Sequence, residues 1–134
     1  RASQPKHESK PEPEALYLKG YQEVQDKNYA AASDTLAGFL AEYPDHKFAG
    51  NAQYWIGEIY YAKGDWEKAI LEFDKAIKKY PESEKTAASL LKQGFAFEKI
   101  GSKKESKLLL GSVIEKFPKS PEAGLARKRL ESMK

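Results

Sequence analysis

The sequence predicts an all-α protein built from three copies of one helical hairpin and closed by an additional helix. The main observation is a self-similarity on a spacing of 37 residues, which is typical of helical repeat proteins. On this spacing an aromatic residue followed by proline recurs, and a glycine recurs in the earlier part of each copy. The recurring residues are Gly20, Gly57 and Gly94, then Tyr43, Tyr80 and Phe117, and finally Pro44, Pro81 and Pro118.

Each copy is predicted to fold as two helices separated by a short turn. Gly64 and Gly101 are expected at the end of the first helix, because glycine adopts the left-handed conformation that other residues resist. Asp65 and Ser102 follow as predicted N-caps, and Ser102 with Glu105 has the capping-box spacing. The second helix ends at the repeated proline, which cannot continue it. The predicted helices span 13–26, 29–43, 47–63, 66–80, 84–100, 103–117 and 121–133.

The residue pattern within the copies is that of the tetratricopeptide repeat (TPR). A small residue in the second helix accompanies the glycine of the first, so that the two antiparallel helices approach closely. A large apolar residue follows one turn later and is expected to plug into the neighbouring repeat. The first repeat is atypical, since Glu23 stands where the others have Tyr60 and Phe97. The small residues are Ala32, Ala69 and Ser106, and the large ones are Leu36, Phe73 and Leu110.

The two ends of the chain have different predicted roles. Residues 1–13 contain three prolines and almost no apolar residues, so they are expected to be a flexible linker. Residues 14–134 form the predicted TPR superhelix, and its last helix, 121–133, covers the apolar end of the stack. The predicted repeats run over about 13–46, 50–83 and 87–120.

Composition and charge exclude several classes of protein. Cysteine is absent, which excludes disulfides and thiol chemistry, and no window approaches about 18 apolar residues, so membrane insertion is not expected. The net charge is +3, with 11 Lys/Arg against 14 Asp/Glu in residues 1–83 and 12 against 6 in residues 84–134. The lysines of the basic half are scattered among glutamates at helical spacing, which indicates a solvated helix surface and no nucleic-acid site.

No catalytic, cofactor or metal site is predicted, so the chain is not expected to be an enzyme. Two isolated histidines do not complete a zinc site without cysteine. Gly101-Ser102-Lys103 resembles the end of a phosphate-binding loop, but Ala96 stands where that motif needs glycine. Glu58 and Glu98 are expected to approach one another on neighbouring helices, as paired carboxylates do in glycosidases, but such pairs on repeat surfaces are usually polar rims.

The concave side of the stack is the predicted binding site for a partner helix or extended segment. This face is unusually aromatic, which is typical of recognition surfaces. Tyr17, Tyr21 and Tyr61 are expected to be the exposed members, while Tyr54, Trp55 and Phe95 alternatively pack between repeats. A chaperone-type carboxylate clamp is disfavoured, because only Lys92 fits its pattern. The predicted partner-binding residues are Tyr17, Tyr21, Asn51, Tyr54, Trp55, Glu58, Tyr61, Lys92, Phe95 and Glu98.

Over residues 15–132 the chain resembles the Tol-Pal system YbgF family, also called the cell division coordinator CpoB family. Ser106, where alanine is usual, is a departure from the family pattern. The segments that carry the resemblance are Asn51-Ala-Gln-Tyr-Trp-Ile-Gly-Glu-Ile-Tyr-Tyr61, Gly64-Asp65, Tyr80-Pro81-Glu82-Ser83-Glu84-Lys85, Leu90-Leu91-Lys92-Gln93-Gly94 and Ser120-Pro121-Glu122-Ala123.

The resemblance implies a periplasmic protein of a Gram-negative bacterium. Members have a signal peptide, a trimerising N-terminal coiled coil, a proline-rich linker and then a TPR domain that binds TolA. The family coordinates outer-membrane constriction with septal peptidoglycan synthesis during division, through a bifunctional peptidoglycan synthase. Without the coiled coil, this fragment is expected to be monomeric or weakly associating.

Two alternatives share the same sequence features. One is the TPR lipoprotein subunit of the outer-membrane barrel-assembly machine, which has similar Tyr-Pro-x-Ser corners but normally more repeats. The other is a generic TPR adaptor.

Overall fold

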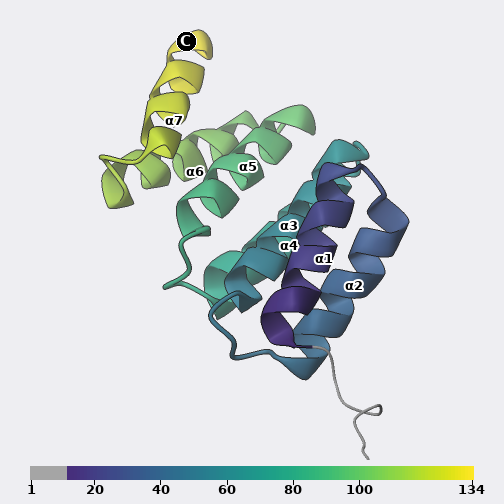
Figure 1. The fold of residues 1–134 in the computed structure, drawn as a ribbon. Helices are drawn as coiled ribbons and strands as arrows, with labels where there is room; N and C mark the ends of the chain where they lie inside the picture. The colour runs from purple at the N-terminus through teal and green to yellow at the C-terminus, as the bar shows by residue number, and fades with distance from the viewer. Residues whose placement is uncertain (1–11) are drawn as a thin grey trace, which may run out of the picture.

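A computed structural model describes residues 12–134, which form seven α-helices and no strand (Figure 1). Every helix begins and ends within two residues of its predicted bounds, so the all-α repeat prediction is confirmed. Most of the predicted linker lies outside the described residues. The helices are α1 (Pro13–Gln25), α2 (Tyr29–Glu42), α3 (Ala49–Ala62), α4 (Trp66–Lys79), α5 (Thr86–Lys99), α6 (Lys103–Lys116) and α7 (Pro121–Ser132).

Successive helices pack as hairpins, α1 with α2, α3 with α4 and α5 with α6, and α7 packs on the last hairpin. Figure 1 shows the α1–α2 hairpin at one end of the stack and α7 at the other. The first helices also contact one another, α1 with α3 and α3 with α5, whereas α2, α4 and α6 do not. The stack therefore curves, with α1, α3 and α5 as its inner row.

The turn inside each hairpin has one residue in the left-handed region. Gly64 and Gly101 have φ of 75° and 85°, as predicted, and Lys27 occupies the same place in the first repeat with φ of 63°. A backbone hydrogen bond spans the turn and closes each hairpin. In the second hairpin, for example, the Asp65 amide donates to the Tyr60 carbonyl at 2.9 Å. Lys27 is the strained member, because a side chain disfavours this conformation.

Two residues predicted as N-caps occupy the expected positions but do not cap their helices through the side chain. Asp65 and Ser102 stand at the N-cap positions, but neither side chain makes a capping bond. Their ψ angles of 74° and 70° are not extended, because their amides are held by the bond across the turn. Ser120, with ψ of 155°, is extended, and its Oγ accepts from the Ala123 amide at 3.0 Å.

The repeated glycine lies against the large apolar residue of its own hairpin. A Cβ on Gly57 would stand 2.5 Å from the Phe73 ring, and one on Gly20 would stand 2.6 Å from Leu36. The large residue was expected to plug into the neighbouring repeat. It packs instead against the glycine of its own repeat, and Phe73 also shares a buried cluster with Ala88 of the next repeat.

The final helix covers the end of the stack. Ala123 and Ala126 are fully buried, and Leu130 and Met133 pack into the cluster that surrounds Leu110. Small residues on the buried face let α7 approach closely, as the first helix of a fourth repeat would. None of the described helices combines the length and apolar content needed to cross a bilayer.

Candidate partner-binding groove

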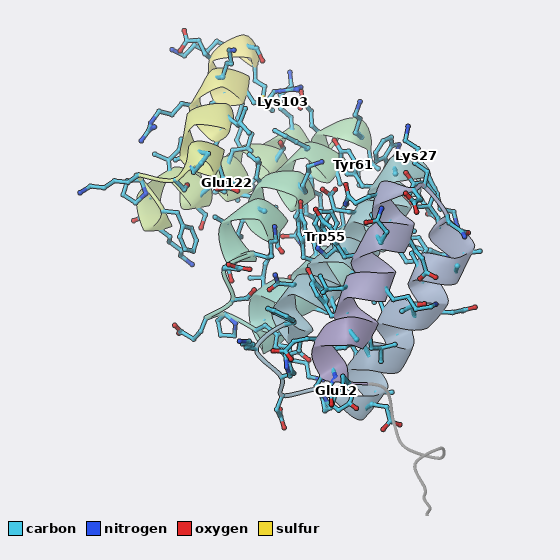
Figure 2. All side chains as sticks on the ribbon, viewed as in Figure 1. Glu12, Lys27, Trp55, Tyr61, Lys103 and Glu122 are labelled. Carbon is cyan, nitrogen blue, oxygen red and sulfur yellow. The ribbon has the colours of Figure 1, made fainter. Side chains whose placement is uncertain are left out.

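The inner row of helices presents a groove lined by aromatic side chains. Figure 2 shows Trp55 and Tyr61, both on α3, between α1 and α5. Tyr21, Trp55, Tyr61 and Phe95 are half-buried, so each offers part of its ring to solvent. We define the aromatic groove by Tyr17, Tyr21, Tyr54, Trp55, Tyr61 and Phe95.

Tyr17 is not the exposed contact residue that the sequence predicts. It is only 6% exposed, and its hydroxyl accepts a hydrogen bond of 3.0 Å from Trp55 Nε1. Its ring centroid lies 4.8 Å from that of Phe48 and 5.9 Å from that of Phe39. Burial raises the pKa of the Tyr17 hydroxyl. The role of Tyr17 is therefore to position Trp55 between α1 and α3.

Tyr54 and Asn51 are also buried, and for Tyr54 this favours the alternative that it packs between repeats. The Tyr54 hydroxyl donates to Glu58 Oε2 at 2.6 Å, and its ring centroid lies 5.8 Å from that of Phe73. Burial, reinforced by the Glu58 carboxylate, raises the pKa of Tyr54 far above its usual range. Asn51 Nδ2 donates to Glu84 Oε2 at 2.8 Å. Each residue thus holds a carboxylate that lines the groove, Glu58 in one case and Glu84 in the other.

An ion pair crosses the middle of the groove from α3 to α5. Lys92 Nζ lies 3.1 Å from Glu58 Oε1 and 4.5 Å from the centroid of the Tyr61 ring. Both charged side chains are largely shielded, with exposures of 28% for Lys92 and 17% for Glu58. The ammonium is held by a carboxylate and an aromatic face together, which fixes its position in the groove.

A second ion pair, from α5 to α7, repeats this arrangement. Arg129 Nη1 lies 3.0 Å from Glu98 Oε1, and the guanidinium carbon lies 5.1 Å from the Phe95 ring centroid. Glu58 and Glu98, which the sequence is expected to bring together on neighbouring helices, thus each have a cation of their own. The two cations offset the charges of both carboxylates.

Three groove residues were missed by counting along the inner helices. Lys85 lies 5.2 Å above the Trp55 ring, and it makes no ion pair among the described residues. The repeat spacing could have found it, because Lys85 stands 37 residues after Phe48, which also reaches the groove. In the same way Arg129 stands 37 residues after Lys92.

Two hollows open along the groove, with Trp55 in the walls of both. Their walls combine aromatic rings with an ammonium and a carboxylate, which suits the side chains of a protein segment. The first, of about 400 Å³, is lined by Tyr17, Leu18, Tyr21, Phe48, Asn51, Trp55, Glu84 and Lys85. The second, of about 290 Å³, is lined by Val24, Gln25, Lys27, Tyr29, Trp55, Glu58, Tyr61, Ala62 and Lys92.

Within residues 12–134, no group of three or more histidine, aspartate or glutamate side chains is placed to hold a metal ion. The polar groups of the groove pair with one another across neighbouring helices. The geometry therefore offers a surface for another molecule to rest on.

Comparisons with known proteins agree with this architecture. Two solved structures share the fold over most of their length: the Arabidopsis OM64 TPR domain and the Yersinia enterocolitica type III secretion translocator chaperone SycD. The first has a TM-score of 0.74 and 17% identity, and the alignment covers 91% of this chain and 96% of that one. The second has a TM-score of 0.75 and 18% identity, covering 96% and 92%. At these identities the likeness establishes the TPR fold alone.

Curated sequences confirm the resemblance noted above. Cell division coordinator CpoB of Pseudomonas putida, including that of strain KT2440, is 43% identical over 56 residues. The match covers 41% of this chain and 21% of the relative, so it spans about a fifth of the relative's length. A family model described as YfiO, outer membrane lipoprotein, matches residues 9–134. Because that match takes in nearly the whole sequence, the chain belongs to the YfiO family.

Proposed function

We propose that this chain is a protein-interaction module of the Tol-Pal cell-envelope system that binds a TolA-like partner in the aromatic groove. In this proposal the protein acts in the periplasm, is not an enzyme, and links outer-membrane constriction to septal peptidoglycan synthesis during cell division. A peptidoglycan synthase is its second partner, and an N-terminal coiled coil makes the full-length protein a trimer.

The observation that carries the binding role is the aromatic groove itself. Tyr21, Trp55, Tyr61 and Phe95 are half-buried on one curved face, and a cation lies over each of the last three rings. Partly exposed aromatic side chains are the usual anchors of protein interfaces. The assignment to cell division is supported by the 43% identity to the coordinator CpoB.

Titration of TolA into the purified chain tests this proposal. Tyr61→Ala with Lys85→Glu removes one aromatic face and reverses the cation that has no ion pair, and neither change touches the Tyr17–Trp55 hydrogen bond. We expect at least a tenfold loss of affinity, the order of about 1.4 kcal/mol or more. Lys103→Glu, an exposed charge reversal on α6, is the matched control and should bind normally. Equal binding by the groove variant would refute the groove as the site.

The family match favours a second candidate, a scaffold of outer-membrane barrel assembly. The YfiO model extends over residues 9–134, much further than the 56 residues shared with the coordinator. Pull-down from a Gram-negative envelope extract separates the two candidates. If barrel-assembly components are recovered in place of TolA, and the Tyr61→Ala/Lys85→Glu variant no longer recovers them, the groove binds the barrel-assembly machine.

A further inference from the structure

The outer side of the stack carries an apolar groove that the aromatic groove does not explain. It has a volume of about 410 Å³ and lies between α4 and α6, with α5 as its floor. Leu71 and Leu108 are 62% and 66% exposed on its two walls. We call it the α4–α6 groove; its apolar lining is Ile70, Leu71, Phe97, Leu108 and Leu109.

Repeat packing does not require apolar residues on the α4 wall of this groove. The equivalent junction one repeat earlier, between α2 and α4, has Asp34 at the position of Leu71. Ser33 likewise takes the place of Ile70 there. The fold therefore forms a junction of the same kind with polar residues at both positions. Large leucines that remain more than half exposed at the later junction gain little from folding, which indicates that another molecule covers them.

The charges that line the α4–α6 groove are acidic. Asp74 stands on the α4 wall and Glu105 on the α6 wall, whereas no lysine or arginine is among the lining residues. Glu105 makes no ion pair among the described residues, and Asp74 has only the exposed Lys78, at 3.3 Å. At the earlier junction Lys68 takes the place of Glu105, so the acidic rim is specific to this groove.

We infer that the α4–α6 groove is a second docking site, which takes an amphipathic helix of a partner protein with an apolar ridge and lysine or arginine at its edges. Two neighbouring helices with a gap between them accept the i, i+4 ridge of a third helix. The exposed apolar walls receive the ridge, and Asp74 and Glu105 receive the cations. This site is separate from the aromatic groove and does not depend on the function proposed for it.

A second copy of the chain fits the groove less well. The other strongly exposed leucines of the described residues are Leu18 on α1 and Leu125 on α7, 57% and 51% exposed. Leu18 lines the aromatic groove beside Tyr21, and only Lys128 and Arg129 stand one turn after Leu125, so neither helix offers a separate apolar ridge of two turns. A helix of a different protein is therefore the occupant that matches the shape and charge of the groove.

Fluorescence anisotropy with two labelled helical peptides tests the inference on the full chain. Both peptides carry leucines at i, i+3, i+4 and i+7; one has lysines at the edges of this ridge and its twin has glutamates. We expect the lysine peptide to bind at least tenfold more tightly than the glutamate twin. Asp74→Asn with Glu105→Gln should remove most of that preference while weak binding of both peptides persists.

Leu71→Asp identifies the site, because it introduces the residue that the first repeat already has at this position and so leaves folding intact. It should weaken the lysine peptide at least tenfold, whereas Lys75→Ala on α4 and Tyr61→Ala in the aromatic groove should not. Equal affinity for the two peptides, or unchanged binding by Leu71→Asp, would overturn the inference. A dimer of the chain seen by analytical ultracentrifugation and absent in Leu71→Asp would also overturn it, because the groove would then be occupied by a second copy of the chain.

Discussion

Substitution of Gly57 by alanine tests how closely the helices of a TPR hairpin must approach. A Cβ at this position would stand 2.5 Å from Cδ1 and Cε1 of Phe73, about 1 Å inside an ordinary carbon–carbon contact. Phe73 is fully buried in a cluster with Tyr54, Ala69 and Ala88, so its ring has no free space to move into. The clash is therefore relieved only by separating α3 from α4.

The magnitude follows from two opposing effects. Overpacking of a buried site costs about 1–3 kcal/mol, and we expect the upper part of that range because a rigid ring receives the clash. Alanine in place of glycine inside a helix returns about 1 kcal/mol. The net loss for Gly57→Ala is therefore about 1–2 kcal/mol, which for a chain of this size lowers Tm by roughly 3–8 °C.

Urea unfolding followed by circular dichroism measures this loss, with Gly38→Ala as the matched control. Gly38 also lies inside a helix, but no atom stands within 4 Å of its added Cβ, so alanine should stabilise by about 0.5–1 kcal/mol. Phe73→Leu combined with Gly57→Ala should be less destabilising than the sum of the single changes. If Gly57→Ala were as stable as Gly38→Ala, close approach at this glycine would not be what holds the hairpin together.

Three further predictions follow from the turns, the caps and the buried tyrosines. Lys27→Gly should raise the free energy of unfolding by about 1 kcal/mol, because the left-handed φ of 63° is unfavourable for lysine; a lower urea midpoint would contradict this. Ser120→Ala should cost about 1 kcal/mol through loss of its bond to the Ala123 amide, and an unchanged thermal midpoint would show that the cap contributes nothing. Burial raises the pKa of Tyr17 and Tyr54, so their contribution to stability is complete below about pH 10 and is lost as pH rises further, when the unfolded chain ionises first. In a titration followed by tyrosinate absorbance at 295 nm, the exposed tyrosines should ionise first, and the part of the signal from Tyr17 and Tyr54 should appear only as the chain unfolds. Ionisation of every tyrosine while circular dichroism still shows a helical protein would refute this.

Close pairing of residues across the groove was only partly predictable from the sequence. Helical counting brought Trp55, Glu58 and Lys92 to one face, and the structure places them there. Helical counting also predicted an exposed Tyr17, because it gives the direction in which a side chain points but not which residues cover that side chain. Burial of Tyr17 depends on Phe48, which approaches from the corner before α3.

The sequence by itself determined the all-α repeat, the helix bounds and the left-handed glycines of the turns. These features depend on local chemistry and on the 37-residue spacing, and both are visible along the chain. Only the tertiary structure decided which aromatic rings remain open, and that Glu58 pairs with Lys92 and Glu98 with Arg129. Such pairings depend on the angle at which successive hairpins stack, which is set by contacts between residues far apart in the chain.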